Sequence, residues 1–214
     1  MSLQPLPDVS EHYFTGGPAT AAERRPLRVE LRGHAVEVEV AGGVFSPTRL
    51  DLGTSVLLRR VPSPPNGADV NLLDIGCGWG PITIALALAA PEATIWAVDA
   101  SERALDLTRR NAERLGLPNV RACLPEQVPP AVRFEAAWSN PPIRVGKSTL
   151  HEILASWLPR LEAVREQDSS GAWLVVQRNL GADSLARWIE ADLGQPVTRH
   201  GSSKGFRVLH VAAA

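Results

Sequence analysis

The feature that most constrains this chain is a glycine-rich turn in residues 71–80, which read N-L-L-D-I-G-C-G-W-G. Apolar residues lead into Asp74, as in a strand, and glycines then stand at every second position. Pro81 begins a run of small and apolar residues that is typical of a helix, because proline is tolerated in the first turn. Glycine permits a positive φ, and its missing Cβ lets a ligand touch the backbone. The order strand, glycine turn and helix predicts a cradle for a nucleotide-like ligand such as NAD or S-adenosylmethionine.

The length and composition indicate one globular α/β domain with a small extension. The 214 residues are 44% hydrophobic and 21% charged, which is ordinary for such a domain. The formal net charge of -1 argues against a large non-specific nucleic-acid surface but leaves room for a local basic patch. No apolar run approaches the roughly 20 residues that span a bilayer, and we expect no signal peptide. Cys77 and Cys123 are not spaced like metal ligands, so we expect no metal site and reduced thiols in a cytoplasmic protein.

Two parts follow one another along the chain. Residues 1–66 are predicted to hold an N-terminal arm, a β-hairpin over 27–40 with alternating apolar and polar residues, and a lead-in helix. Residues 67–214 alternate strands and helices, which predicts a doubly wound, mostly parallel sheet and therefore an α/β fold. The expected strands are 71–75, 94–98, 120–124, 134–138 and 172–177 with a closing hairpin over 196–211, and the expected helices are 81–90, 101–116, 148–165 and 183–193. In such sheets, ligands bind beyond the carboxyl ends of the strands.

Asp99 ends the second of these strands, 25 residues after Asp74. A carboxylate in that place can accept hydrogen bonds from both hydroxyls of a ribose. Asp74 itself is unusual for an NAD-binding turn of the form G-x-G-x-x-G. The pattern D-x-G-x-G-x-G found here resembles motif I of the class I S-adenosylmethionine-dependent methyltransferases. That resemblance favours a methyl donor over NAD as the ligand.

The tetrapeptide Asn140-Pro141-Pro142-Ile143 follows the fourth strand. Two successive prolines stiffen the backbone and leave carbonyl groups without a role in the sheet. Beside a methyl donor, the Asn140 side-chain oxygen and the Pro141 carbonyl can accept both hydrogens of an amino group, which aligns the nitrogen lone pair with the methyl carbon. The tetrapeptide resembles the N-P-P-[YF] signature of methyltransferases that act on exocyclic or amide nitrogen. We therefore expect Asn140, Pro141 and Pro142 to be catalytic.

Several segments together resemble the RsmC-type family, whose best-known members methylate guanine N2 in small-subunit ribosomal RNA. They are H-Y-F at 12–14, G-V-F-S at 43–46, L-D-L-G-T at 50–54, the glycine turn, and S-N-P-P-I-R-V-G-K at 139–147. The resemblance implies a Rossmann-like sheet of seven mostly parallel strands, with helices on both faces and an antiparallel last strand. The N-terminal β-hairpin would precede this sheet as a short lead-in segment. The resemblance also implies S-adenosylmethionine as the cofactor and RNA, most directly small-subunit ribosomal RNA, as the partner.

The same resemblance assigns the site residues. The cofactor-binding residues that it implies are Asp74, Gly76, Cys77, Gly78, Trp79, Gly80, Asp99, Ala100 and Asn140. Trp79 lies inside the turn and is expected to flank the methionine moiety. The implied substrate-binding residues are Ile143, Arg144 and Lys147, and the two cations are expected to contact RNA phosphate.

Three departures from the family pattern matter. The longer RsmC-type enzymes carry an inactive duplicate of the domain, whereas this chain has a short lead-in and so resembles the single-domain branch. Ile143 replaces the aromatic residue that would stack on a target base, a contact worth about 1–3 kcal/mol. The loop after the third strand reads C-L-P-E-Q, so the acidic residue usual near the adenine is absent at Leu124 or displaced to Glu126.

The sequence leaves other functions open. A protein glutamine-amide N-methyltransferase uses the same N-P-P geometry and needs no base-stacking aromatic. A catalytically silent module that binds S-adenosylmethionine or RNA would fit Ile143, but the intact Asn140-Pro141-Pro142 argues against it. An NAD-dependent oxidoreductase is disfavoured, because no residue pair for hydride chemistry stands out. The sequence does not decide between a monomer and a homodimer.

Overall fold

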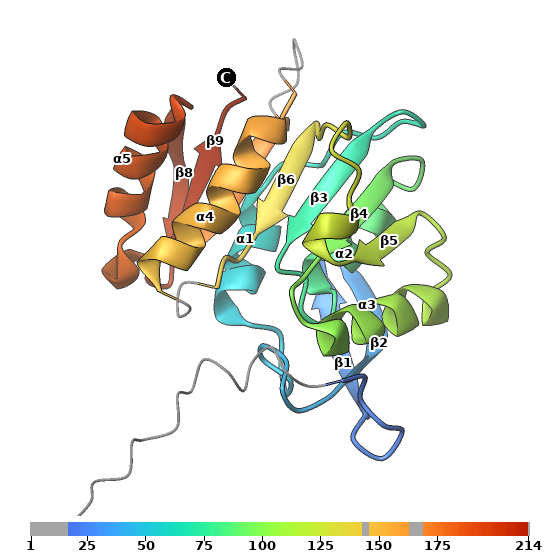
Figure 1. Cartoon of the computed structure of the whole chain (residues 1–214). Helices are drawn as coiled ribbons and strands as arrows, with labels where there is room; N and C mark the ends of the chain where they lie inside the picture. Colours follow the sequence, from blue (N-terminus) through green and yellow to red (C-terminus); the bar gives the residue numbers. More distant parts are fainter. Residues whose placement is uncertain (1–16, 143–145, 163–168, 214) are drawn as a thin grey trace, which may run out of the picture.

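The computed structural model describes residues 17–142, 146–162 and 169–213, and Figure 1 shows how its elements are arranged. The central sheet has seven strands in the order β5-β4-β3-β6-β7-β9-β8. Its strands are β3 (Asn71–Ile75), β4 (Thr94–Val98), β5 (Val120–Cys123), β6 (Ala136–Ser139), β7 (Gly171–Gln177), β8 (Val197–Ser203) and β9 (Phe206–Val211). The first five are parallel to one another, and β9 is antiparallel to both β7 and β8. The predicted seven-stranded sheet with an antiparallel last strand is confirmed.

The central parallel strands are buried, which explains their apolar sequences. β3 reads N-L-L-D-I and β4 reads T-I-W-A-V, and in each strand four of the five residues are buried. Continuous apolar runs of this kind are typical of parallel strands that helices cover on both sides. One edge of such a sheet carries all the carboxyl ends, so the loops after β3, β4 and β6 meet there.

The last two strands form the expected closing hairpin. They are joined by Lys204 and Gly205, whose φ angles are 50° and 82°. A two-residue turn with positive φ at both positions suits the right-handed twist of the flanking strands. The turn lies within the segment 196–211 that was predicted to form this hairpin. β9 inserts between β7 and β8, a strand order that the hairpin pattern did not predict.

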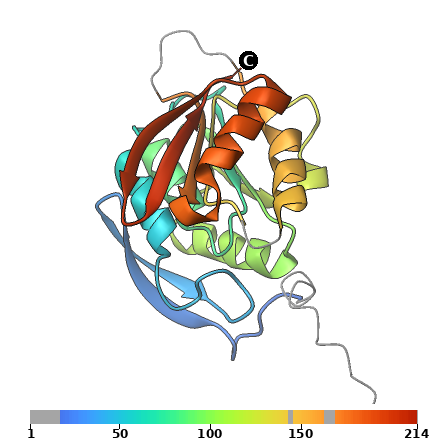
Figure 2. The same cartoon turned by 90° about the vertical axis from the view of Figure 1, so that its left-hand side faces the viewer.

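Helices cover both faces of the sheet, as predicted. They are α1 (Leu52–Arg60), α2 (Pro81–Ala89), α3 (Glu102–Arg114), α4 (Lys147–Trp157) and α5 (Ala182–Leu193). α1 and α2 pack into the core on one face, whereas α4 and α5 pack on the opposite face (Figure 2). α3 lies beside β5 at the sheet edge. Within the described residues, none of these helices is long and apolar enough to cross a membrane.

Two predicted boundaries on the α4 side are wrong. The helix expected over 148–165 ends at Trp157, and a short 3-10 turn (Leu158–Arg160) follows it. Pro159 has no N–H to donate within an α-helix, which accounts for the change. The strand expected at 134–138 begins at Ala136, because Phe134 instead forms an isolated bridge with Leu161.

The N-terminal hairpin forms a separate two-stranded sheet, β1 (Arg25–Leu31) and β2 (His34–Val40). Leu31, Val38 and Val40 are buried in the same core as α1 and α2. The Asn111 side chain of α3 also accepts a hydrogen bond from the Glu39 N–H and donates one to the Glu39 carbonyl. The hairpin is thus fixed to the main sheet's helices. The expected domain boundary at residue 66 stays a prediction.

Candidate active site

A pocket lies at the carboxyl ends of the strands, where β3 and β6 run side by side. The residues that line it are Phe45, Ser46, Asp51, Thr54, Gly76, Cys77, Gly78, Trp79, Pro81, Ile82 and Asn140. Asp74 pairs with Trp138 across β3 and β6, so the glycine turn and Asn140 leave the sheet together. A Cβ built on Gly76 would lie 3.9 Å from Pro142 Cδ. The two motifs that the sequence analysis singled out therefore lie close together and line the same pocket.

The turn after β3 requires its glycines. Gly76, Gly78 and Gly80 have φ angles of 79°, 59° and 93°, a region that other L-residues rarely adopt. A Cβ on Gly80 would also lie 3.1 Å from the Thr108 hydroxyl oxygen. The backbone N–H groups of Gly76 and Cys77 both donate to the Val98 carbonyl, at 2.8 and 3.0 Å. These bonds hold the turn against the end of β4, where Asp99 follows.

Asp74 is fully buried at the base of this turn. Its Oδ2 accepts a 2.6 Å hydrogen bond from the Thr83 hydroxyl, whereas its Oδ1 is buried with no hydrogen-bond partner among the described residues. Burial, with a smaller contribution from the negative charge of Asp99, raises the pKa of Asp74 to about 7 against the opposing effect of the Thr83 bonds. A buried carboxylate oxygen without a partner is suited to a cationic donor, such as an ammonium group, that arrives with a ligand.

Asp99 faces the glycine turn from the end of β4. Its Oδ2 accepts from the Gly78 N–H at 3.0 Å, and its Oδ1 accepts from the Ser101 N–H at 2.9 Å. Burial raises the pKa of Asp99, and these backbone bonds oppose that shift. Each oxygen keeps a further lone pair, so the fixed carboxylate can accept two hydroxyl donors. The neighbouring Ala100 is exposed.

The Asn140 side chain is fixed by residues that the sequence analysis gave no role. Its Nδ2 donates to Asp51 Oδ2 at 2.8 Å and to the Thr54 hydroxyl oxygen at 3.1 Å. Both N–H groups of the amide are thus engaged, and the carbonyl oxygen is the part left to receive a donor. Asp51 and Thr54 belong to L-D-L-G-T, a segment that contributed to the family resemblance. That segment was the available signal, but nothing in it indicated contact with Asn140.

Two expected cofactor residues direct their side chains into the core. Cys77 is 2% exposed and packs with Ala97 and Leu105. Trp79 is also 2% exposed, and its indole N–H donates to the Ser46 carbonyl at 3.3 Å. Trp79 therefore anchors the loop that carries Phe45, and its predicted place beside a methionine moiety stays a prediction.

The predicted substrate-binding residues are placed in part. Lys147 is exposed at the first position of α4, whereas Ile143, Arg144 and the aromatic segment at 12–14 lie outside the described residues. Leu124 is partly buried and packs against the cluster of Cys77, Ala97 and Leu105, and Glu126 is exposed on a short turn. The described residues hold no group of three His, Cys, Asp or Glu that could bind a metal ion.

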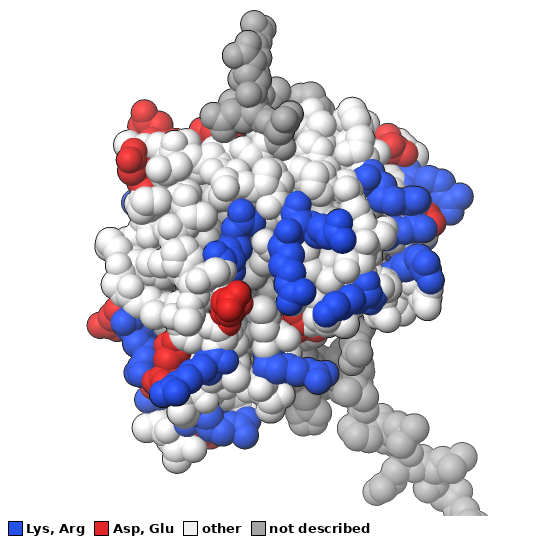
Figure 3. All heavy atoms as spheres, turned by 180° about the vertical axis from the view of Figure 1, so that it is seen from behind, with Lys and Arg blue, Asp and Glu red and all other residues white. Residues whose placement is uncertain are grey.

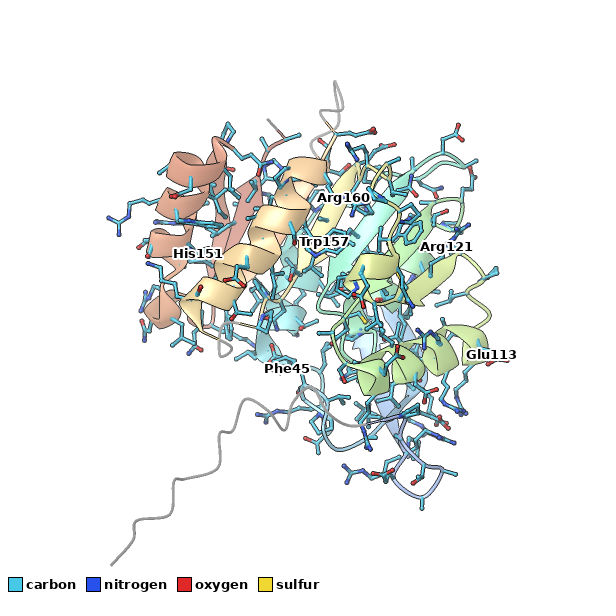
Figure 4. The ribbon with its side chains drawn as sticks, in the orientation of Figure 1. Phe45, Glu113, Arg121, His151, Trp157 and Arg160 are labelled. Atoms are coloured by element: carbon cyan, nitrogen blue, oxygen red, sulfur yellow. The ribbon has the colours of Figure 1, made fainter. Side chains whose placement is uncertain are left out.

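Phe45 stands out at the mouth of the pocket. Its ring is 45% exposed, although it lines the pocket beside Asn140. Figure 4 shows it beyond the sheet's carboxyl edge, near the start of α1. The sequence analysis quoted it within G-V-F-S but gave it no role. An exposed aromatic residue at the mouth of a pocket is suited to stacking against a planar group.

Comparison with known families and proteins identifies relatives of the whole chain. Residues 35–210 match the family described as "Methyltransferase small domain". The uncharacterised protein YbxB of Bacillus subtilis is 32% identical over 204 residues, which cover 94% of this chain and 98% of that protein. Ribosomal RNA small subunit methyltransferase C of Acinetobacter baylyi is 30% identical and matches 91% of this chain.

The ribosomal RNA methyltransferases among these relatives are longer. This chain spans 58% of the Acinetobacter protein and 41% of ribosomal RNA large subunit methyltransferase G of Shewanella putrefaciens. A similar fold occurs in the T. thermophilus 16S rRNA N2 G1207 methyltransferase, solved with AdoMet and guanosine. The TM-score is 0.76 at 20% identity, and the match covers 92% of this chain and 52% of that one.

Proposed function

Because the chain belongs to the methyltransferase small domain family and is a class I methyltransferase that uses S-adenosylmethionine, we propose that it methylates ribosomal RNA. The proposed acceptor is an exocyclic amino group, most directly that of guanine N2. The observation that carries the proposal is the closeness of the glycine turn to Asn140-Pro141-Pro142, where the described residues leave the Asn140 carbonyl oxygen to receive a donor. In this arrangement, the proposed acceptor for amine hydrogens would lie beside the proposed methyl-donor site. A ribosomal RNA substrate would place the enzyme in the cytoplasm.

The residues around the turn fit the donor. Asp99 would accept the two ribose hydroxyls, since its oxygens are already fixed by the Gly78 and Ser101 N–H groups. Asp74 would receive the ammonium group of the methionine moiety at its unpartnered Oδ1. The glycines would let the ligand touch the backbone. When bound, S-adenosylmethionine supplies a sulfonium methyl group, and sulfur keeps the electron pair of the broken C–S bond.

Asn140 and Pro141 would orient the acceptor. The Asn140 side-chain oxygen and the Pro141 carbonyl accept the two hydrogens of the amino group, which directs its nitrogen lone pair to the methyl carbon for the new C–N bond. Both acceptors favour the positive charge that develops on nitrogen during this displacement. The surplus proton then leaves nitrogen for water. The residues thus contribute alignment and electrostatics and need no strong base.

Two further observations support a nucleobase of RNA as the acceptor. Phe45 offers an aromatic ring at the pocket mouth, where it can provide stacking that Ile143 does not. On the face that carries α1, Lys and Arg side chains gather while Asp and Glu are fewer (Figure 3), although the chain as a whole has a net charge of -1. Arg59 and Arg60 end α1 and are exposed there. Together with Lys147 and Arg144, such cations would contact phosphate.

The substrate is tested by methyl transfer from tritiated S-adenosylmethionine. The acceptors are unmodified 30S subunits, naked ribosomal RNA and release-factor protein. We expect label in RNA, and digestion to nucleosides should place it on N2-methylguanosine. Label in the protein would instead support the glutamine-amide alternative. Binding of S-adenosylhomocysteine without transfer to any acceptor would support the silent module.

Asp74 should make donor binding depend on pH. If its ionised form pairs with the ligand's ammonium group, the affinity for S-adenosylhomocysteine falls as the pH decreases below the Asp74 pKa of about 7. One group that must be ionised gives binding about 20-fold weaker at pH 5.5 than at pH 7.5. Over most of that range the ligand's amino group stays charged. Calorimetric titration across it measures the change.

Asp74→Asn is the matched variant for this prediction, because it keeps an oxygen for the Thr83 hydroxyl but cannot ionise. Its affinity should be low and nearly independent of pH. A raised carboxyl pKa also means that ionisation destabilises the apo fold, so its contribution to the free energy of unfolding falls as pH rises from the ordinary value of 3.8 to about 7. Asp74→Asn should therefore lose this contribution to the pH dependence of the free energy of unfolding. An unchanged pH profile of ligand affinity in Asp74→Asn would contradict the ammonium contact.

A further inference from the structure

We propose that Asp51 and Thr54, at the start of α1, are positioning residues that fix the orientation of the Asn140 amide and polarise its carbonyl oxygen. The inference rests on the proposed role of Asn140 as the acceptor of the substrate's amino hydrogens. It assigns a function in the reaction to the lead-in segment, which precedes the first strand of the main sheet.

The hydrogen bonds leave one orientation for the amide. Asp51 Oδ2 and the Thr54 hydroxyl oxygen lie 2.8 and 3.1 Å from Asn140 Nδ2. Asp51 Oδ2 also accepts from the Thr54 backbone N–H at 3.1 Å, as the N-cap of α1. If the amide were flipped, its oxygen would face an ionised carboxylate, which can only accept. The Asn140 oxygen is therefore kept on the side away from α1.

The local packing holds Asp51 and Thr54 in place. Thr54 is 3% exposed, and its helix packs against β7 and β9. Gly53, between the two residues, has no room for a side chain. A Cβ built there would lie 2.9 Å from both Asp51 Oδ2 and Phe206 Cε1. The start of α1 is thus seated against β9 and cannot shift freely away from Asn140.

The charge of Asp51 adds to the effect of orientation. A hydrogen bond from an amide N–H to a carboxylate is charge-assisted, and it shifts electron density of the amide toward its oxygen. The Asn140 oxygen then becomes a stronger acceptor for an amino group whose nitrogen gains positive charge. Asp51 acts on the reaction through Asn140 and needs no contact with the substrate.

Thr54→Val and Thr54→Ser form the sharpest test, because valine keeps the shape while serine keeps the hydroxyl. With unmodified 30S subunits as the acceptor, Thr54→Val should lower kcat about tenfold and Thr54→Ser should retain most activity, since misplaced catalytic groups cost up to about 10²-fold. Asp51→Ala should cost about 30-fold by the same principle. Asp51→Asn keeps an oxygen acceptor but loses the charge, so its kcat should lie between those of Asp51→Ala and wild type. In all four variants, affinity for S-adenosylhomocysteine should be unchanged.

A second readout does not depend on turnover. The two side-chain N–H resonances of Asn140, identified by their loss in Asn140→Ala, should exchange slowly with water in the apo protein. They should shift and exchange faster in Thr54→Val and Asp51→Ala. Ser55→Ala removes a hydroxyl from the same helical turn, where it accepts from Arg59, and should leave both kcat and these resonances unchanged.

The outcomes separate the two proposals. If the wild type methylates no acceptor, the proposed function fails, while the Asn140 resonances still report whether the amide is fixed. If Thr54→Val and Asp51→Ala keep wild-type kcat, or if the resonances do not change in them, the positioning role is overturned. A loss of kcat with an equal loss of ligand affinity would also overturn it, because it would indicate a distorted pocket.

Discussion

The Asn140→Ala variant is expected to transfer methyl groups about 10²–10³-fold more slowly than the wild type, the cost of removing one aligned polar group from a reaction centre. The amide oxygen would no longer orient the amino group or stabilise the charge that develops on its nitrogen. Affinity for S-adenosylhomocysteine should fall much less than the transfer rate, because Asp74 and Asp99 remain. Single-turnover transfer to 30S subunits and calorimetric titration measure the two quantities.

Asn140→Asp is a control variant whose expected effect follows from the contact of Asn140 with Asp51. It has the same shape, but it places a second carboxylate 2.8 Å from Asp51 Oδ2. Like charges at that separation repel, so this variant should be inactive and also melt at a lower temperature than the wild type. Adding Asp51→Asn should restore the melting temperature, because an amide then faces a carboxylate again. Full activity in Asn140→Ala would show that the residue does not orient the amine.

The Asp99→Ala variant should bind S-adenosylhomocysteine at least about 100-fold more weakly, since hydrogen bonds to a charged group contribute about 1.5–3 kcal/mol each. The loss removes the acceptor for both ribose hydroxyls. It also leaves the Gly78 and Ser101 N–H groups without their present partner, which loosens the glycine turn. Calorimetric titration measures the dissociation constant directly.

Asp99→Asn should give an intermediate affinity, because it keeps one oxygen in place. The matched control is Asp106→Ala, which removes a carboxylate that pairs with Arg110 on the surface of α3. Its affinity should equal that of the wild type. If Asp99→Ala bound the ligand as tightly as Asp106→Ala does, the ribose contact would be wrong.

Much of the fold could be predicted because its signals are local. Four of five residues are buried in each of β3 and β4, and their apolar runs are typical of covered parallel strands. Gly76, Gly78 and Gly80 could be assigned to a turn because glycine tolerates the positive φ that each of them adopts. The end of α4 was missed, although Pro159 was a visible signal, because the apolar pattern continued beyond it.

The part of the site that the sequence did not reveal depends on contacts between distant segments. Asp51 and Thr54 precede Asn140 by more than eighty residues. The segment L-D-L-G-T indicates a helix N-cap, but it does not indicate that the capping residue also accepts a hydrogen bond from Asn140. Likewise, Phe45 lies in a loop whose position is set by the Trp79 side chain. Contacts of this kind follow from the tertiary fold, and one sequence contains no local pattern for them.

The packing of the start of α1 against Phe206 of β9 has a consequence for the order in which the protein folds during synthesis. The start of α1 is synthesised well before β9, the strand against which it packs. At 5–20 residues per second, roughly 8–31 s separate Asp51 from Phe206. Until β9 pairs with β7, α1 lacks part of the surface on which it packs. We therefore expect the Asn140 amide to be fixed only after β9 has been made, so that a nascent chain that already holds the glycine turn is not yet a competent enzyme.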